Sequence, residues 1–318
     1  MSATPRGPAA DPLAPLLAGG APVVIDGGLA TQLEAAGHDL SDRLWSSRLL
    51  ADDPEAIVAA HLAYFRAGAR VAISASYQAT FAGFAVRGLS REEAAGLLAG
   101  SVRLAGEARD RYRAEVAPRD PGRLLVAASI GPYGAFLADG SEYRGGYGLD
   151  RGALRDFHRD RLRVLWAARP DLLACETIPD AVEVGALADL LGETGAVGWL
   201  AVSCIDGGHL RDGTPVEEAA AVADATPAFV AVGVNCTAPE HVPELIGRIR
   251  AVSAKPIVAY PNSGEGWDAA AGRWLPAGGS TVDGAAARVW VAAGARLVGG
   301  CCRVGPARIA ELAAAFGS

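Results

Sequence analysis

The sequence predicts a single-domain α/β protein with the (β/α)8 TIM-barrel fold. Eight short apolar runs alternate along the chain with eight segments of helical period. The runs are continuous in hydrophobicity, which is typical of strands covered on both faces, as in a parallel sheet. The length of 318 residues also lies within the usual range of such a barrel.

Each predicted strand ends at polar residues or glycine. In chain order the strands cover residues 22–28, 70–77, 123–133, 171–179, 198–204, 229–236, 255–263 and 295–302. A doubly wound open sheet is the alternative architecture. Because no Gly-x-Gly-x-x-Gly turn follows the first run, the dinucleotide-binding version of that fold has no support.

The predicted helices are rich in alanine and follow the strands. They cover residues 54–69, 91–115, 150–168, 179–194, 215–226, 239–253, 284–295 and 305–316. Several begin with proline and acidic residues, which are favoured in a first helical turn. No linker divides the chain, so we predict one domain over residues 21–318 after a flexible N-terminal leader over residues 1–20.

Composition indicates a globular protein that acts on small molecules. Hydrophobic residues make up 51% of the chain and charged residues 20%, as in ordinary folded domains. A net charge of -7 without basic runs argues against nucleic acid or an anionic membrane as partner. No stretch approaches eighteen uninterrupted apolar residues, and the N-terminus lacks the apolar segment of a signal peptide. We therefore expect a cytoplasmic protein with small-molecule substrates, either a monomer or a homo-oligomer.

Three of the five cysteines follow strands whose ends should meet. Cys236 ends the sixth predicted strand, and Cys301 and Cys302 end the eighth. Active sites of these barrels lie at the carboxyl ends of the strands, so the three thiols should converge there. In a cytoplasmic chain an odd number of cysteines favours metal binding or a reactive thiol over disulfides. Cys175 and Cys204 are interpreted as small packing residues.

Three converging thiols are a ligand set for Zn²⁺. The ion takes thiolates at about 2.3 Å in a tetrahedron, and catalytic sites leave one corner open. Sulfur ligands also favour zinc over magnesium or calcium. Adjacent residues of a strand point to opposite faces, so Cys301 and Cys302 reach one ion only if the backbone leaves β geometry. Gly299 and Gly300 permit that bend because they carry no Cβ.

Further polar residues should face the same rim. They include Asp26, Ser74, Ser76, Glu176 and Asn235. Two acids at a barrel mouth also fit a glycosidase, but thiols have no role in that chemistry. None of the five histidines follows a strand, so each is expected on a helix or loop surface, and a histidine-based metal site is disfavoured.

Eight stretches of the chain resemble one known family when taken together. They are DGGLATQLE, ASYQATFAGF, SIGPYGAFLADGSEYRGGY, CETIPDAVE, DGTPVEEA, GVNCTAPEHV, YPNSGEGWD and GGCCRVGPARI. In order and approximate spacing they resemble the zinc-dependent homocysteine S-methyltransferases, and most closely the branch that uses S-methylmethionine or S-adenosylmethionine as methyl donor. The resemblance runs from about Val23 to the C-terminus, and the pair GVNC and GGCC is its specific part.

The resemblance implies a role for each candidate residue. It implies a (β/α)8 barrel whose single zinc ion is held by the catalytic cysteines Cys236, Cys301 and Cys302. It also implies that Asp26 and Glu176 bind the amino group of homocysteine. Gly27 and one serine of the second strand, Ser74 or Ser76, should lie near the carboxylate of that substrate, and Asn235 should hydrogen-bond groups of the site.

The chemistry of such an enzyme explains the thiol cluster. A thiol titrates near pH 8.5, so only a few per cent is thiolate at neutral pH, and coordination to zinc deprotonates it. The loop over residues 131–148 is long enough to act as a lid. Two alternatives are a betaine-type donor in the same family and a non-catalytic zinc or thiol sensor, which has no need for the two carboxylates.

Overall fold

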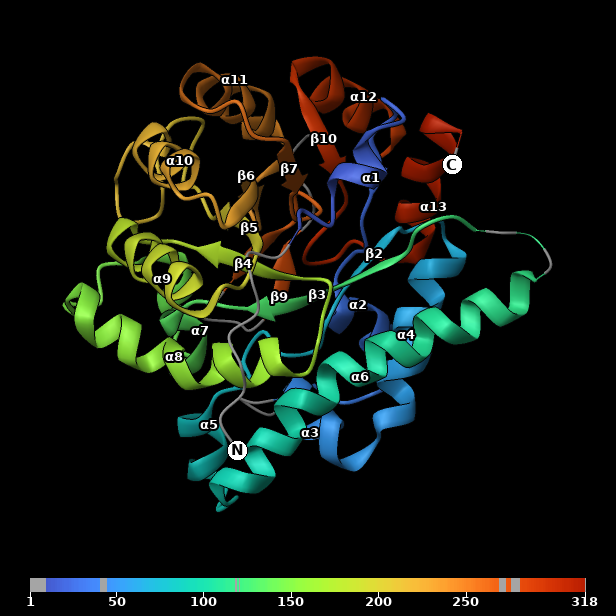
Figure 1. Ribbon diagram of the computed structural model, residues 1–318. Coiled ribbons are helices and arrows are strands. Elements are labelled where there is room, and N and C mark those ends of the chain that lie inside the picture. Colours follow the sequence, from blue (N-terminus) through green and yellow to red (C-terminus); the bar gives the residue numbers. More distant parts are fainter. Residues whose placement is uncertain are drawn as a thin grey trace.

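Eight parallel strands form the central sheet of the computed structural model, which describes residues 10–40, 45–117, 119, 121–268, 273–275 and 281–317. They are β1 (Val23–Val24), β2 (Val71–Ile73), β3 (Leu125–Ile130), β4 (Leu172–Ile178), β5 (Gly198–Val202), β6 (Phe229–Asn235), β7 (Ile257–Tyr260) and β10 (Ala295–Val298). The strands pair in the order β1-β10-β7-β6-β5-β4-β3-β2. A parallel bridge between Ile25 and Val71 joins the two ends of this order, so the sheet closes into a barrel (Figure 1).

Helices surround the barrel and confirm the predicted alternation. They are α4 (Pro54–Arg66), α6 (Arg91–Val116), α8 (Arg151–Ala167), α9 (Ala181–Thr194), α10 (Val216–Ala225), α11 (Val242–Val252), α12 (Gly284–Ala293) and α13 (Pro306–Phe316). Side-chain oxygen atoms cap the first turns of several of them, among others those of Asp53, Ser90, Asp150, Asp180 and Asp283. The predicted (β/α)8 fold is therefore confirmed element by element.

The structure contains several further short elements, of which only a short helix or turn near the end of the leader was expected. They are α1 (Ala14–Leu17), α2 (Leu29–Ala35), α3 (Trp45–Asp52), α5 (Phe81–Val86), α7 (Tyr133–Leu137), the 3-10 helices η1 (Ser141–Tyr143) and η2 (Pro239–His241), and the hairpin of β8 (Gly266–Asp268) and β9 (Arg273–Leu275). Helix α1 belongs to the expected leader, yet Leu13 beside it is fully buried among side chains of the barrel interior. Residues 1–9 lie outside the described residues, and the boundary at residue 20 stays a prediction.

Two apolar layers separate the inside of the barrel from its outer coat. One cluster collects every second residue of the strands, for example Leu125 and Ala127 of β3 and Leu172 and Ala174 of β4. The residues between them pack outward against the helices. Because side chains alternate along a strand, Glu176 continues the inward-facing set of β4 beyond Ala174. The register of the strands thus directs a carboxylate into the mouth of the barrel.

Among the helices of the described residues, none combines the length and the apolar composition that a bilayer crossing needs.

Candidate active site

Three cysteines converge at the carboxyl ends of β6 and β10. The Sγ atom of Cys236 lies 3.7 Å from that of Cys302, which in turn lies 4.0 Å from the Sγ atom of Cys301. All three sulfur atoms lie within 4.8 Å of one another. Tetrahedral ligands at about 2.3 Å from one ion would be about 3.8 Å apart. The spacing therefore fits a single metal ion held by three thiolates.

Cys175 and Cys204, in contrast, are buried in the outer apolar layer, as their interpretation as packing residues predicted.

The backbone at Cys236 turns this side chain toward the other two. Strand β6 ends at Asn235, and Cys236 has a φ of 48°, a left-handed conformation that is uncommon outside glycine. On the other side, the amide of Cys301 donates to the carbonyl of Pro261 over 2.7 Å, and the carbonyl of Cys302 accepts from the amide of Ser263 over 3.0 Å. The loop after β7 thus fixes the cysteine pair, while the conformation of Cys236 brings in the third thiol.

Gly299 and Gly300 serve a different purpose from the one expected. Neither has a positive φ, so a special backbone conformation does not require them. A Cβ at Gly299 would lie 2.4 Å from Cγ1 of Ile25, and one at Gly300 would lie 2.1 Å from Cγ1 of Val304. The two glycines are needed for close packing between β10, the end of β1 and the start of the following loop. This packing determines where the cysteine pair lies.

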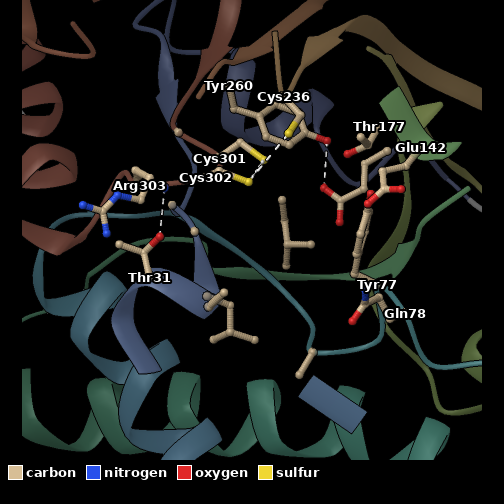
Figure 2. Close-up of a pocket in the computed structure, with 18 of the residues that line it drawn as sticks. Thr31, Tyr77, Gln78, Glu142, Thr177, Cys236, Tyr260, Cys301, Cys302 and Arg303 are labelled. Atoms are coloured by element: carbon tan, nitrogen blue, oxygen red, sulfur yellow. Dashed lines mark hydrogen bonds between the residues drawn. The ribbon is translucent and has the colours of Figure 1, made fainter. Parts of the chain in front are cut away.

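The three sulfurs form part of the wall of a cavity of about 370 Å³. Strand ends supply Gly27, Ser74, Glu176, Cys236 and Tyr260 to the wall. The N-terminal part of α2 and the loop over residues 131–148, here called the lid, supply further lining residues. Figure 2 shows the three cysteines in the wall, with Tyr77, Gln78 and Glu142 to one side of them and Arg303 to the other. A cavity of this size and depth suits a small-molecule ligand.

Glu176 is held at the cavity by two hydroxyl groups. One carboxylate oxygen accepts a hydrogen bond from Ser129, and the other accepts from the hydroxyl of Tyr260 over 3.1 Å. Burial raises the pKa of Glu176 to about 7, although both hydrogen bonds oppose the shift. A buried carboxylate with this pKa is ready to accept a cationic group of a ligand.

Asp26 lies directly behind the cavity wall. Its Oδ2 atom accepts from the amide of Ile73 over 2.7 Å, while its Oδ1 atom is buried without a hydrogen-bond partner among the described residues. Burial raises the pKa of Asp26 well above its usual range, the bond from Ile73 opposes this, and the charge of Glu176 raises it further. The two predicted acids are thus close enough to interact, although Glu176 lines the cavity and Asp26 does not.

The predicted serines and Asn235 have different surroundings. Ser74 lines the cavity, whereas Ser76 donates to the carbonyl of Ser129 over 2.8 Å and lies deeper. The side chain of Asn235 is fully buried, with its oxygen accepting from the amide of Thr177 over 2.6 Å and its amide donating to the Thr177 hydroxyl over 2.8 Å. Thr177 has a φ of 59°. Asn235 therefore stabilises the irregular end of β4 that follows Glu176.

The thiols influence one another's titration. Hydrogen bonds from Cys301 and Cys302 hold the pKa of Cys236 well below its usual range. The pKa of Cys301 and that of Cys302 are raised well above the usual range, chiefly by the hydrogen bond of each with Cys236. The first thiolate therefore forms readily and the next two form against its charge, which is the behaviour of a cluster that a bound cation would stabilise.

Several residues of the site were not identified from the sequence. Ser129 and Tyr260 occupy inward positions at strand ends, so counting every second residue of β3 and β7 would have found them. Gln78 lies in a loop and Glu142 in the short helix η1, where no periodic pattern indicates direction. Tyr143, also in the lid, carries a hydroxyl 3.7 Å from Sγ of Cys236. The lid thus reaches the sulfur cluster itself.

The histidines were not all placed correctly by the sequence. His61 and His158 are fully buried rather than exposed. His158 lies under the lid, where Nε2 is 2.7 Å from Oε1 of Glu183 and Nδ1 is 2.7 Å from a guanidinium nitrogen of Arg161. His158 can be buried because Arg161 on α8 and Glu183 on α9 lie within hydrogen-bond distance of its two ring nitrogens.

A (β/α)8 barrel with a cavity at the strand ends and three cysteines able to hold a metal ion defines a class of metal-thiolate barrel proteins. Within that class, the family model described as homocysteine S-methyltransferase matches residues 23–316, and the chain belongs to this family. The predicted family resemblance is thereby confirmed.

Individual relatives are similar over most of their length. Homocysteine S-methyltransferase 4 of Zea mays is 50% identical over 81% of this chain and 78% of its own. Homocysteine S-methyltransferase YbgG of Bacillus subtilis is 47% identical over 79% of this chain and 81% of its own. A crystal structure of the metallated form of the homocysteine methyltransferase MmuM of Escherichia coli superposes with a TM-score of 0.87 at 45% identity, covering 96% of this chain and 99% of that one.

Proposed function

We propose that this protein transfers a methyl group from a sulfonium donor, S-methylmethionine or S-adenosylmethionine, to L-homocysteine, and that methionine is the product. One observation carries the proposal. Three sulfur atoms at the spacing of a zinc site line the same cavity as a buried carboxylate suited to an ammonium group. Membership of the homocysteine S-methyltransferase family supports it.

We assign the metal to Zn²⁺ and its ligands to Cys236, Cys301 and Cys302. When bound, zinc would supply the acidity that converts the substrate thiol into a nucleophilic thiolate near neutral pH. The three thiolates are soft donors, which suit zinc better than calcium or magnesium. The similarity to the metallated form of MmuM of Escherichia coli supports a metal at this site.

The remaining polar groups would orient the amino acid. Glu176 is proposed to bind its ammonium group directly at the cavity wall, and Asp26 behind the wall, whose Oδ1 atom has no partner among the described residues, is proposed to support this binding. Gly27 and Ser74 line the cavity beside these acids and are proposed to face the carboxylate. Ser76 and Asn235 would act indirectly, by holding Ser74 and the end of β4. Fixing the substrate in this way favours in-line attack on the donor methyl group.

A cytoplasmic location is part of the proposal and is supported by five free cysteines. The absence of nucleic-acid partners and the oligomeric state stay predictions.

The test is a methyl-transfer assay with the zinc-loaded protein. Homocysteine is offered with S-methylmethionine, S-adenosylmethionine or betaine, and methionine is measured. We expect product with at least one sulfonium donor and none with betaine. Product with betaine alone would replace the donor assignment, and no product with any donor would favour a zinc or thiol sensor.

A further inference from the structure

Two buried oxygen atoms of the cavity wall have no hydrogen-bond partner. Of the described residues that line the cavity, only Gln78 and Glu142 carry such atoms, namely Oε1 of Gln78 and Oε2 of Glu142. A buried polar atom without a partner costs about 1–3 kcal/mol. Two acceptors left open in one cavity therefore point to a ligand that brings N–H or O–H donors.

Glu142 lies close to the sulfur cluster without touching it. The next residue, Tyr143, places its hydroxyl 3.7 Å from Sγ of Cys236, and the charge of Cys236 contributes to a raised pKa of Glu142, whose main cause is burial. Figure 2 shows the Glu142 carboxylate beside Tyr77, and burial, with the charge of Glu142 as the next cause, raises the pKa of Tyr77. A ligand group bound by Glu142 would thus lie in the same cavity as the sulfur cluster.

Two other carboxylates line the cavity: Glu34 is exposed on α2, and Glu176 already has hydrogen-bond partners. Glu176 accepts hydrogen bonds from Ser129 and Tyr260 and is assigned to the acceptor amino acid. Glu142 comes from the lid, on a different element, and has an open oxygen. The cavity therefore offers a second anionic position for a second cationic group.

We propose that Glu142 and Gln78 bind the ammonium group of an amino-acid methyl donor and so select sulfonium donors that carry N–H groups. This inference rests on the proposed methyl transfer. An ammonium group has three N–H donors, so it can donate to more than one acceptor, and its charge complements Glu142. Betaine has a quaternary nitrogen without N–H, so it cannot donate a hydrogen bond to either open oxygen.

The test compares donors in matched variants of the zinc-loaded protein. Glu142→Gln removes the charge, and Gln78→Met removes the amide oxygen at similar length. The control is Glu240→Gln, which makes the same glutamate-to-glutamine change at an exposed residue of η2. The donors are S-methylmethionine and a dimethylsulfonium carboxylate that lacks the amino group. We expect Glu142→Gln to raise KM for S-methylmethionine about 10- to 100-fold, as the loss of a charged hydrogen bond predicts.

Three further readouts distinguish donor recognition from general damage. KM for homocysteine and the zinc content should stay unchanged in Glu142→Gln, and its preference for S-methylmethionine over the amine-free sulfonium should collapse. An equal loss with both donors, or a loss confined to KM for homocysteine, would overturn the inference.

Calorimetric binding of S-methylmethionine gives a measure independent of turnover. If the wild-type protein binds it but transfers no methyl group, the proposed function fails while a selective loss of binding in Glu142→Gln still supports this inference. If the wild-type protein does not bind it, the inference is wrong.

Discussion

The Sγ atom of Cys236 lies 3.7 Å from the Sγ atom of Cys302, although 66 residues separate the two cysteines in the chain. Strands β6 and β10 pair with opposite edges of β7, and this pairing brings their carboxyl ends close enough for the contact. The contact therefore depends on the fold, and the proposed metal site should require each of the three thiols.

Replacing one cysteine of the cluster should remove the metal. Cys302→Ser leaves two thiolates, too few for a stable site of this type, so zinc should fall from about one ion per chain to nearly none after dialysis. Elemental analysis of the purified protein measures this. Cys204→Ala removes a buried thiol of the outer layer and should leave zinc unchanged. Zinc retained in Cys302→Ser would exclude the three-cysteine site.

Adding a single methyl group at a glycine before the cysteine pair should lower the stability of the protein. Gly300→Ala would place a Cβ 2.1 Å from Cγ1 of Val304, and overpacking of this kind costs about 1–3 kcal/mol. Because relief of the clash displaces the cysteine pair, zinc binding should weaken as well. Denaturant unfolding of the metal-free protein and zinc titration measure the two effects.

Gly247→Ala, in contrast, should stabilise the protein. Gly247 lies within α11, and nothing lies within 4 Å of a Cβ built there. Alanine in an open helical position stabilises by about 0.5–1 kcal/mol. If both glycine variants changed stability in the same direction, the packing explanation for Gly300 would be wrong.

The affinity for homocysteine should depend on pH through Glu176. Its pKa is about 7, so the carboxyl group is largely neutral below that pH and charged above it. Only the charged form attracts an ammonium group, and kcat/KM for homocysteine should therefore rise as pH increases from about 6 to 8. In Glu176→Gln this rise should disappear and KM should increase about 10-fold or more at pH 8. A wild-type profile that falls over this range would contradict the assignment.

The same shift has a consequence for stability. The pKa of Glu176 is raised from the ordinary value of 4.5 to about 7 by burial, so the folded state holds its proton more tightly than the unfolded state. Stability should therefore decrease as pH rises between those two values, by up to about 3 kcal/mol from this group. Denaturant unfolding of the wild-type protein and of Glu176→Gln should show a difference that grows over this range and then levels off.

The features that could be predicted are those that depend on the spacing of apolar residues and on the position of polar residues at strand ends. Continuous apolar runs and their polar ends were enough to predict the barrel, the three cysteines and Glu176 as rim residues. The contact between Gly300 and Val304 could not be predicted, because it depends on how two loops pack in space. Neither could the conformation of Cys236, since φ values of non-glycine residues are set by their surroundings. Lid residues such as Glu142 gave no signal because no repeating pattern fixes their direction.

The buried charges under the lid lead to a last prediction, on stability. Arg161 is almost fully buried and donates to the carbonyl of Gly131 over 2.5 Å and to His158 over 2.7 Å. Glu183 accepts from the amide of Tyr133 over 2.6 Å and pairs with His158. Both ends of this network therefore hold the start of the lid. The charge of Arg161 lowers the pKa of Glu183, against a larger rise caused by burial.

Removing Arg161 should destabilise the protein without emptying the metal site. Arg161→Met leaves Glu183 buried without its cationic neighbour, and breaking a buried pair costs about 3–5 kcal/mol. Arg155→Met, on the same helix, removes a partly exposed arginine that pairs with Asp189 and Glu193, a change worth at most about 1 kcal/mol. Denaturant unfolding compares the two, and zinc content should be unchanged in both because neither arginine contacts the cysteines. Equal stability of the two variants would mean that the lid is held by other contacts.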